Sequence, residues 1–142
     1  MIVCLRFSAV TPQRFQRRIP ADAGELASTR RAIRLWLDGR GDSASFGQRL
    51  LLAVGEALTN AIEHAYRDRR PGVIDLSIRD DGDDSLHVSV RDEGRWREAS
   101  DQPDRGRGFA IIRALATGLD RQSDGAGTTL TFRLPRAEGA PS

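Results

Sequence analysis

Polar and apolar residues alternate along several segments of the chain, as they do in strands with one buried face. The segments 72–80 and 85–92 are joined by DDGDD, which predicts a hairpin because Asp-Gly suits the positive φ angles of tight turns. The segment 14–19 is expected to be an edge strand, which Pro20 ends. In the predicted hairpin, the residues expected to face inward are Ile74, Leu76, Ile78, Leu86, Val88 and Val90.

Apolar residues recur at helical spacing in the next segment, GELASTRRAIRLWLD. We expect Asp22 to cap this helix, with Glu25 three residues later completing a pair that resembles a capping box. Gly39 and Gly41 are expected to end the helix. The apolar positions that indicate it are Leu26, Ile33, Trp36 and Leu37.

A longer helix is predicted to begin at Asp42 or Ser43 and to extend to about Tyr66. Projection at about 100° per residue gives this helix one apolar stripe, which consists of Leu50, Leu51, Val54, Leu58, Ala61, Ile62 and Ala65. The opposite, polar side consists of Glu56, Thr59, Asn60, Glu63, His64 and Arg67.

A long polar stretch follows the first hairpin. From Glu93 to about Arg107 it shows no periodicity and predicts a loop, and loops of this length in compact domains are functional lids or disordered segments. The segment 108–117 then predicts a short helix, and GLDRQSD and TTLTFRLP predict a second hairpin around GAG. This order of elements predicts an α+β fold, with helices on one face of a mixed or antiparallel sheet.

The chain length and composition fit one folded domain. The 142 residues are enough to bury a core, and 39% hydrophobic with 30% charged residues is a globular balance. We assign residues 14–135 to this domain. Residues 1–13 form an N-terminal extension that fits either a loose segment or an added edge strand, and residues 136–142 form a tail expected to fray.

Charge and cysteine content exclude several classes of protein. The net charge of +2 arises from 22 Lys plus Arg against 20 Asp plus Glu without a dense basic patch, so direct nucleic-acid binding is not implied. The single Cys4 excludes an internal disulfide framework and a Cys-based zinc site. No apolar run approaches the roughly 20 residues that a membrane helix needs, and the first residues lack signal-peptide features. We therefore expect a cytoplasmic protein.

Four short motifs have the residue types of a binding site, although each has a simpler structural explanation when taken alone. Glu56 and Asn60 lie at i and i+4 on one side of the long helix, which is equally typical of a solvated face. Asp92 ends an apolar strand and suits a turn. It also suits a carboxylate that accepts a hydrogen bond from an exocyclic amino group, while Gly94 lets a flat ring approach the backbone.

The other two motifs are rich in glycine. Gly106 and Gly108 directly precede a predicted helix, where free N–H groups favour an anion, and a flexible junction is the alternative explanation. The pair does not complete the G-x-G-x-x-G pattern of a Rossmann turn. The segment 125–132, GAGTTLTF, is explained most simply as a hairpin turn.

In their order and spacing, these four motifs resemble the ATP-binding fold shared by gyrase, Hsp90, sensor histidine kinases and MutL, which is the Bergerat fold of the GHKL superfamily. The resemblance extends from roughly Phe15 to Leu134. The short form looks like the anti-sigma-factor serine/threonine kinases. It implies ATP and Mg²⁺ as cofactors, a mixed, mostly antiparallel sheet with helices on one face, and a lid over the nucleotide.

The resemblance also implies roles for individual residues. Asn60 would coordinate Mg²⁺ at the phosphates, as a hard oxygen ligand suits a hard cation. Glu56 would be the general base that accepts the proton of the attacking serine hydroxyl. Asp92 matches the adenine-binding acid and Gly94 the glycine beside it. His64 is expected to flank the site and not to accept a phosphoryl group.

Further positions match the lid and the last strand pair. Gly106 and Gly108 match the glycines that cover the phosphates, and Arg105 or Arg107 would reach the γ-phosphate. Thr128 matches the final Gly-Thr element near adenine. The chain departs from the family at Trp96, where a second glycine of the first box is common. We therefore expect a stiffer or differently folded start of the lid, which affects lid closure and nucleotide affinity more than adenine recognition.

The function implied is that of an anti-sigma factor serine-protein kinase. Such a protein phosphorylates an anti-anti-sigma antagonist and otherwise holds a sigma factor inactive. The alternatives are a binding module that sequesters a regulator with nucleotide weakly used or absent, and a kinase domain of a larger regulator. The implied partners are a sigma factor and its antagonist, with a homodimer possible and no nucleic acid or membrane.

Overall fold

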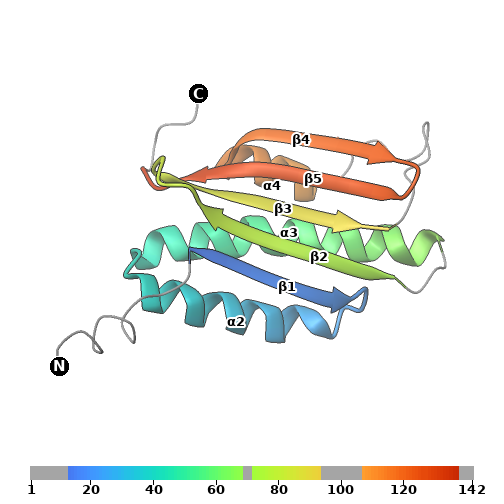
Figure 1. Cartoon of the computed structure of the whole chain (residues 1–142), viewed down its shortest axis with the longest axis horizontal. Coiled ribbons are helices and arrows are strands. Elements are labelled where there is room, and N and C mark those ends of the chain that lie inside the picture. The colour runs from blue at the N-terminus through green and yellow to red at the C-terminus, as the bar shows by residue number, and fades with distance from the viewer. Residues whose placement is uncertain (1–12, 69–71, 94–106, 138–142) are drawn as a thin grey trace.

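The computed structural model describes residues 13–68, 72–93 and 107–137, and in these ranges five strands form one sheet with three helices on a single face (Figure 1). The strand order is β1-β2-β3-β5-β4, and every neighbouring pair is antiparallel. The predicted α+β class and the order of elements are therefore confirmed. The elements are β1 (Arg14–Pro20), α2 (Glu25–Arg40), α3 (Ala44–Asp68), β2 (Val73–Asp80), β3 (Ser85–Asp92), α4 (Arg107–Leu115), β4 (Thr117–Asp124) and β5 (Gly127–Pro135).

The core lies between α3 and the inner face of the sheet. The six residues of β2 and β3 that were expected to face inward are at most 3% exposed, so the alternation predicted the buried face correctly. From α3, the residues packed against them are Leu50, Val54, Leu58, Ala61 and Ile62. Leu51 is only partly buried, and the side chain of Ala65 lies outside the described part. Because apolar residues fill this face, the outer face of the sheet carries the polar residues of the same strands.

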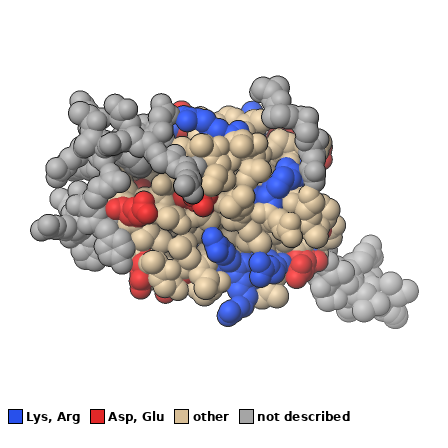
Figure 2. Space-filling view, turned by 180° about the vertical axis from the view of Figure 1, so that it is seen from behind, with Lys and Arg blue, Asp and Glu red and all other residues tan. Residues whose placement is uncertain are grey.

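Charged residues of both signs appear on the helix side of the molecule, separated by broad areas of uncharged surface (Figure 2). Neither sign dominates this face. No helix in the described ranges is both long and apolar enough to cross a membrane.

The ends of α2 and α3 follow local chemistry, with one correction. Asp22 does not cap α2: its carboxylate accepts a hydrogen bond from the N–H of Gly24 at 3.0 Å, and Gly24 is the N-cap residue, without a side-chain cap. Because the Asp22 carboxylate is used in this Asx turn, it is not available for the capping box that was expected. At the other end Gly41 adopts φ +77 and closes α2 as expected. Ser43 caps α3 by accepting from the N–H of Phe46 at 3.1 Å.

A network of two arginines and two aspartates ties the α2–α3 junction to the sheet. Arg40 contacts Asp42 at 3.2 Å and also pairs with Asp80, at the end of β2. Arg136 reaches Asp42 at 2.9 Å and Asp80 at 3.0 Å, although the sequence placed it in the tail. The pKa of Asp80 is held below its ordinary value, first by the hydrogen bond from the N–H of Gly82 and then by the two guanidinium groups.

Replacing Asp80 with Asn is expected to lower the free energy of unfolding by about 1.5–3 kcal/mol at neutral pH, because charge-assisted hydrogen bonds are lost. The folded-state pKa of Asp80 is depressed, so its stabilisation is complete above the unfolded pKa and disappears as the pH falls through the folded value. Urea unfolding between about pH 7 and pH 3 should show the gap between wild type and variant closing in acid. The matched control is Asp75→Asn, because the Asp75–Arg18 pair is largely exposed. A gap that stays constant into acid would contradict this role.

Candidate functional site

Three of the predicted site residues line one small pocket between α3 and the inner face of the sheet. Asn60 comes from α3, Asp92 is the last residue of β3, and Thr128 is the second residue of β5. The free space is about 10 Å³, roughly enough for one water molecule, so a purine can enter only if the lining moves. The other described lining residues are Ala57, Ala61, Val90, Phe109, Arg121 and Leu130.

The pairing of β3 with β5 places the polar residues of this pocket opposite each other. Asp92 is the register partner of Thr128. Gly127 permits this pairing, because a Cβ at that position would lie 2.2 Å from the backbone oxygen of Asp92. The Thr128 hydroxyl is in turn 3.0 Å from the hydroxyl of Ser123 on β4, so the neighbouring strand fixes its position. The Gly-Thr motif thus has a steric reason as well as a chemical one.

Asp92 is a buried carboxylate with a buried histidine beside it. The Asp92 residue is 5% exposed and His64 is 3% exposed, and His64 Nδ1 lies 3.5 Å from a carboxylate oxygen of Asp92. The sequence placed His64 on the polar side of α3, which is wrong. At about 100° per residue His64 falls next to Ala57 at the border of the apolar stripe, and packing against the sheet buries it. His64 therefore lies beside the Asp92 carboxylate on its buried side.

Asn60 and Glu56 lie one turn apart on α3 and differ in their surroundings. The side-chain nitrogen of Asn60 is buried and has no hydrogen-bond partner among the described residues. Buried amides are ordinarily satisfied, so this amide is suited to a bound group, and its oxygen is the type of ligand that Mg²⁺ prefers. Glu56 is half-buried and does not line the pocket. The described residues include no cluster of three His, Cys, Asp or Glu, so a Mg²⁺ here would be held by Asn60 together with the phosphates of its nucleotide.

The predicted lid lies mostly outside the described residues. This applies to Gly94, Arg105 and Gly106. Arg107 and Gly108 form the start of α4, and their side-chain surroundings are not described. Since Phe109, in the same turn, lines the pocket, the N-terminal end of α4 lies at the site, where helix N–H groups favour an anion.

Sequence reasoning missed several residues that shape the pocket. Phe109 had a signal, because it is the first apolar residue after the glycine pair. Gly127 was identified as part of the Gly-Thr element, but its close approach to the backbone of Asp92 was not predicted. Arg121 and Ser123 had no signal, because their proximity depends on the pairing of β4 with β5, whose register shifts between Thr117 and Asp120.

Replacing Gly127 with Ala is expected to destabilise the fold by about 1–3 kcal/mol, because the new methyl group collides with the backbone of β3. The same collision separates Thr128 from Asp92 and should weaken nucleotide binding. Gly125→Ala is the matched control, since a Cβ there meets no atom within 4 Å. Thermal unfolding and nucleotide titration of both variants check this, and equal behaviour of the two would contradict the steric explanation.

Several known proteins share this fold over part of their length. The chain is 36% identical over 96 residues to Blue-light-activated histidine kinase 2 of Erythrobacter litoralis (strain HTCC2594), which covers 63% of this chain and 28% of that protein. The fold matches the solved RsbU and RsbW domains of Rv1364c from Mycobacterium tuberculosis with a TM-score of 0.70 and 26% identity, over 87% of this chain and 32% of that one. It also matches the histidine kinase domain from the Erythrobacter litoralis EL346 blue-light activated histidine kinase, with a TM-score of 0.58 and 32% identity, over 79% of this chain and 59% of that one.

The chain thus spans less than two thirds of the length of each of these relatives. Residues 19–134 match the model of the family described as the histidine kinase-like ATPase domain. This range contains all of α3 and the ends of β3 and β5 that form the pocket. The chain therefore belongs to the histidine kinase-like ATPase domain family.

Proposed function

We propose that this chain is an ATP- and Mg²⁺-dependent serine kinase that phosphorylates an anti-anti-sigma protein and otherwise holds a sigma factor inactive. Family membership makes it an ATP-binding domain of the kinase type. The observation that carries the proposal is the convergence of Asn60, Asp92 and Thr128 on one pocket, one helical turn from Glu56. The match over 87% of the chain to a structure that contains an RsbW domain, which is of the anti-sigma kinase type, supports the choice of substrate class.

Each pocket residue has a different proposed role in nucleotide binding. The Asp92 carboxylate accepts a hydrogen bond from the exocyclic amino group of adenine, and His64 holds that carboxylate in place. Thr128 lies opposite Asp92, at the same end of the pocket. The apolar side chains of Val90, Phe109 and Leu130 offer the flat ring a dry surface once the pocket has widened.

The chemical step requires a base and a stabilised phosphoryl group. Asn60 would hold Mg²⁺, and the metal would offset the negative charge of the phosphates. As the serine oxygen bonds to the γ-phosphorus, Glu56 takes the hydroxyl proton and the bond from that phosphorus to the ADP oxygen breaks. Gly106, Gly108 and either Arg105 or Arg107 would close over the phosphates from the N-terminal end of α4.

A second candidate is the ATP-binding domain of a histidine kinase. The 36% identity over 96 residues to a blue-light-activated histidine kinase favours it. The same pocket would then serve a histidine acceptor. The two candidates differ in the product, because a phosphohistidine is hydrolysed in acid and a phosphoserine is not.

Replacing Glu56 with Gln is expected to lower the rate of phosphoryl transfer by about 10²–10⁴-fold, because the general base is lost. ATP affinity should change little, since Glu56 does not line the pocket. Transfer from γ-labelled ATP to a purified anti-anti-sigma protein measures the rate. Glu63→Gln is the control, being the same change at an exposed position of the same helix. Wild-type rates in the Glu56 variant would refute its role, and acid-labile label on a histidine acceptor would favour the second candidate.

Two variants should separate adenine binding from metal binding. Asp92→Asn is expected to weaken ATP binding at least tenfold with and without Mg²⁺, because the charged acceptor is lost. Asn60→Ala is expected to weaken binding only when Mg²⁺ is present. Calorimetric titration of ATP in the presence and absence of the metal distinguishes them. If wild-type protein showed no binding, both assignments would fail.

A further inference from the structure

The outer face of the sheet, away from the helices, contains a hollow that the nucleotide pocket does not use. Its volume is about 310 Å³, at the lower end of the range for small-molecule sites. None of its lining residues lines the pocket with Asn60 and Asp92. The two sites are on opposite faces because neighbouring residues in a strand point to opposite sides of the sheet. The polar lining residues are Ser77, Arg79, His87, Ser89, Thr131 and Arg133.

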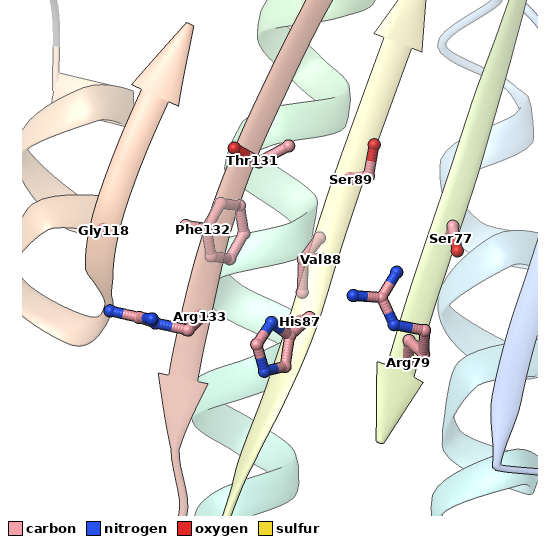
Figure 3. A pocket seen from close by; sticks show the side chains of 9 residues that line it. All are labelled: Ser77, Arg79, His87, Val88, Ser89, Gly118, Thr131, Phe132 and Arg133. Carbon is pink, nitrogen blue, oxygen red and sulfur yellow. The ribbon is translucent and has the colours of Figure 1, made fainter. Parts of the chain in front are cut away.

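Strand register arranges these residues in two parallel rows. His87 of β3 is paired with Arg79 on β2 and with Arg133 on β5, which gives a basic row across three strands. Ser89 of β3 is paired in the same way with Ser77 and Thr131, which gives a row of hydroxyl groups beside it. Figure 3 shows the Arg79 guanidinium extending from β2 toward β3.

An irregularity in β4 shapes the remaining side of the hollow. The register of β4 with β5 shifts between Thr117 and Asp120, and Gly118 within this bulge adopts φ +66. A Cβ at Gly118 would lie 3.3 Å from a terminal nitrogen of Arg133, so the absence of a side chain lets the guanidinium lie close to the strand. The Arg133 side chain points toward Gly118 in Figure 3. Bulges often redirect a side chain in this way.

Two of the three basic side chains of the row are paired with carboxylates. Arg79 is paired with Asp81 at 2.8 Å, and His87 with Asp83 at 2.8 Å. Arg133 has no carboxylate partner within the described ranges. A hollow with one uncompensated guanidinium and a row of hydroxyl donors is complementary to an oxyanion.

We propose that this hollow binds a small phosphomonoester. The donors come from β2, β3 and β5 and surround the hollow, which suits a tetrahedral oxyanion with acceptors in several directions better than a planar carboxylate. A phosphomonoester near pH 7 carries a charge close to −2, so its phosphate oxygens suit the Arg133 guanidinium and the row of hydroxyl donors. The volume leaves room for an organic group beside the phosphate.

The test is a titration of ¹⁵N-labelled protein, with glycerol 3-phosphate, inorganic phosphate and acetate as separate probes. Glycerol 3-phosphate is expected to shift the amide signals of Ser77, Ser89 and Thr131, and to bind more tightly than the other two probes. Arg133→Gln should weaken the binding of glycerol 3-phosphate about tenfold or more, because a charge-assisted contact is lost. Thr131→Val should weaken it several-fold without a change of charge.

The matched control is Arg18→Gln, which removes one positive charge from the edge strand β1 outside the hollow. This variant should bind glycerol 3-phosphate like the wild type. Equal weakening by Arg18→Gln and Arg133→Gln would show attraction by surface charge only and would overturn the site. Equal affinity for the three probes, or shifts confined to residues around Asn60 and Asp92, would overturn it as well.

Discussion

The antiparallel pairing of β3 with β5 is the constraint on which the candidate site depends. The alternation that buries Leu86, Val88 and Val90 continues to Asp92 and brings a carboxylate into the interior at the end of the strand. Burial of a charged group is costly unless other polar groups compensate it. Here β5 provides Thr128 opposite Asp92, and α3 provides His64 on the other side. Gly127 is required because any side chain there would collide with β3.

The long helix α3 carries both a residue that lines this pocket, Asn60, and the residue proposed as the general base, Glu56. Its apolar stripe packs on β2 and β3, and this packing sets its rotation about its own axis. Once that rotation is set, Asn60 lines the pocket and Glu56 lies one turn away, partly accessible. A base that must accept a proton from a second protein benefits from such a position. In the proposed function, the sheet therefore positions the groups that bind the nucleotide, and α3 positions the groups that act on its phosphates.

Much of the fold was predictable because local patterns and long-range packing agree. The strands followed from period-two alternation and α3 from its apolar stripe, since both periods select one buried face. The order of the strands was not predictable, because the insertion of β5 between β3 and β4 depends on pairing between distant segments. The expected cap at Asp22 was wrong because the Asp22 carboxylate accepts from the N–H of Gly24 in a local turn, which competes with capping.

The candidate site shows the same division between local and long-range information. Glu56, Asn60, Asp92 and Thr128 were identified from short motifs, and three of them line one pocket. The burial of His64 was missed because a residue at the border of a stripe can face either way until a partner covers it. The basic and hydroxyl rows on the outer face were missed because they exist only after three strands are placed in register.

The most direct measurement is a crystal structure of the chain with Mg²⁺ and a non-hydrolysable ATP analogue. We expect the adenine amino group within hydrogen-bond distance of Asp92, Mg²⁺ coordinated by Asn60, and Phe109 displaced from its present position to admit the ring. A nucleotide bound elsewhere, or adenine in this pocket without contact to Asp92, would contradict the central claim that this end of the sheet is the ATP site.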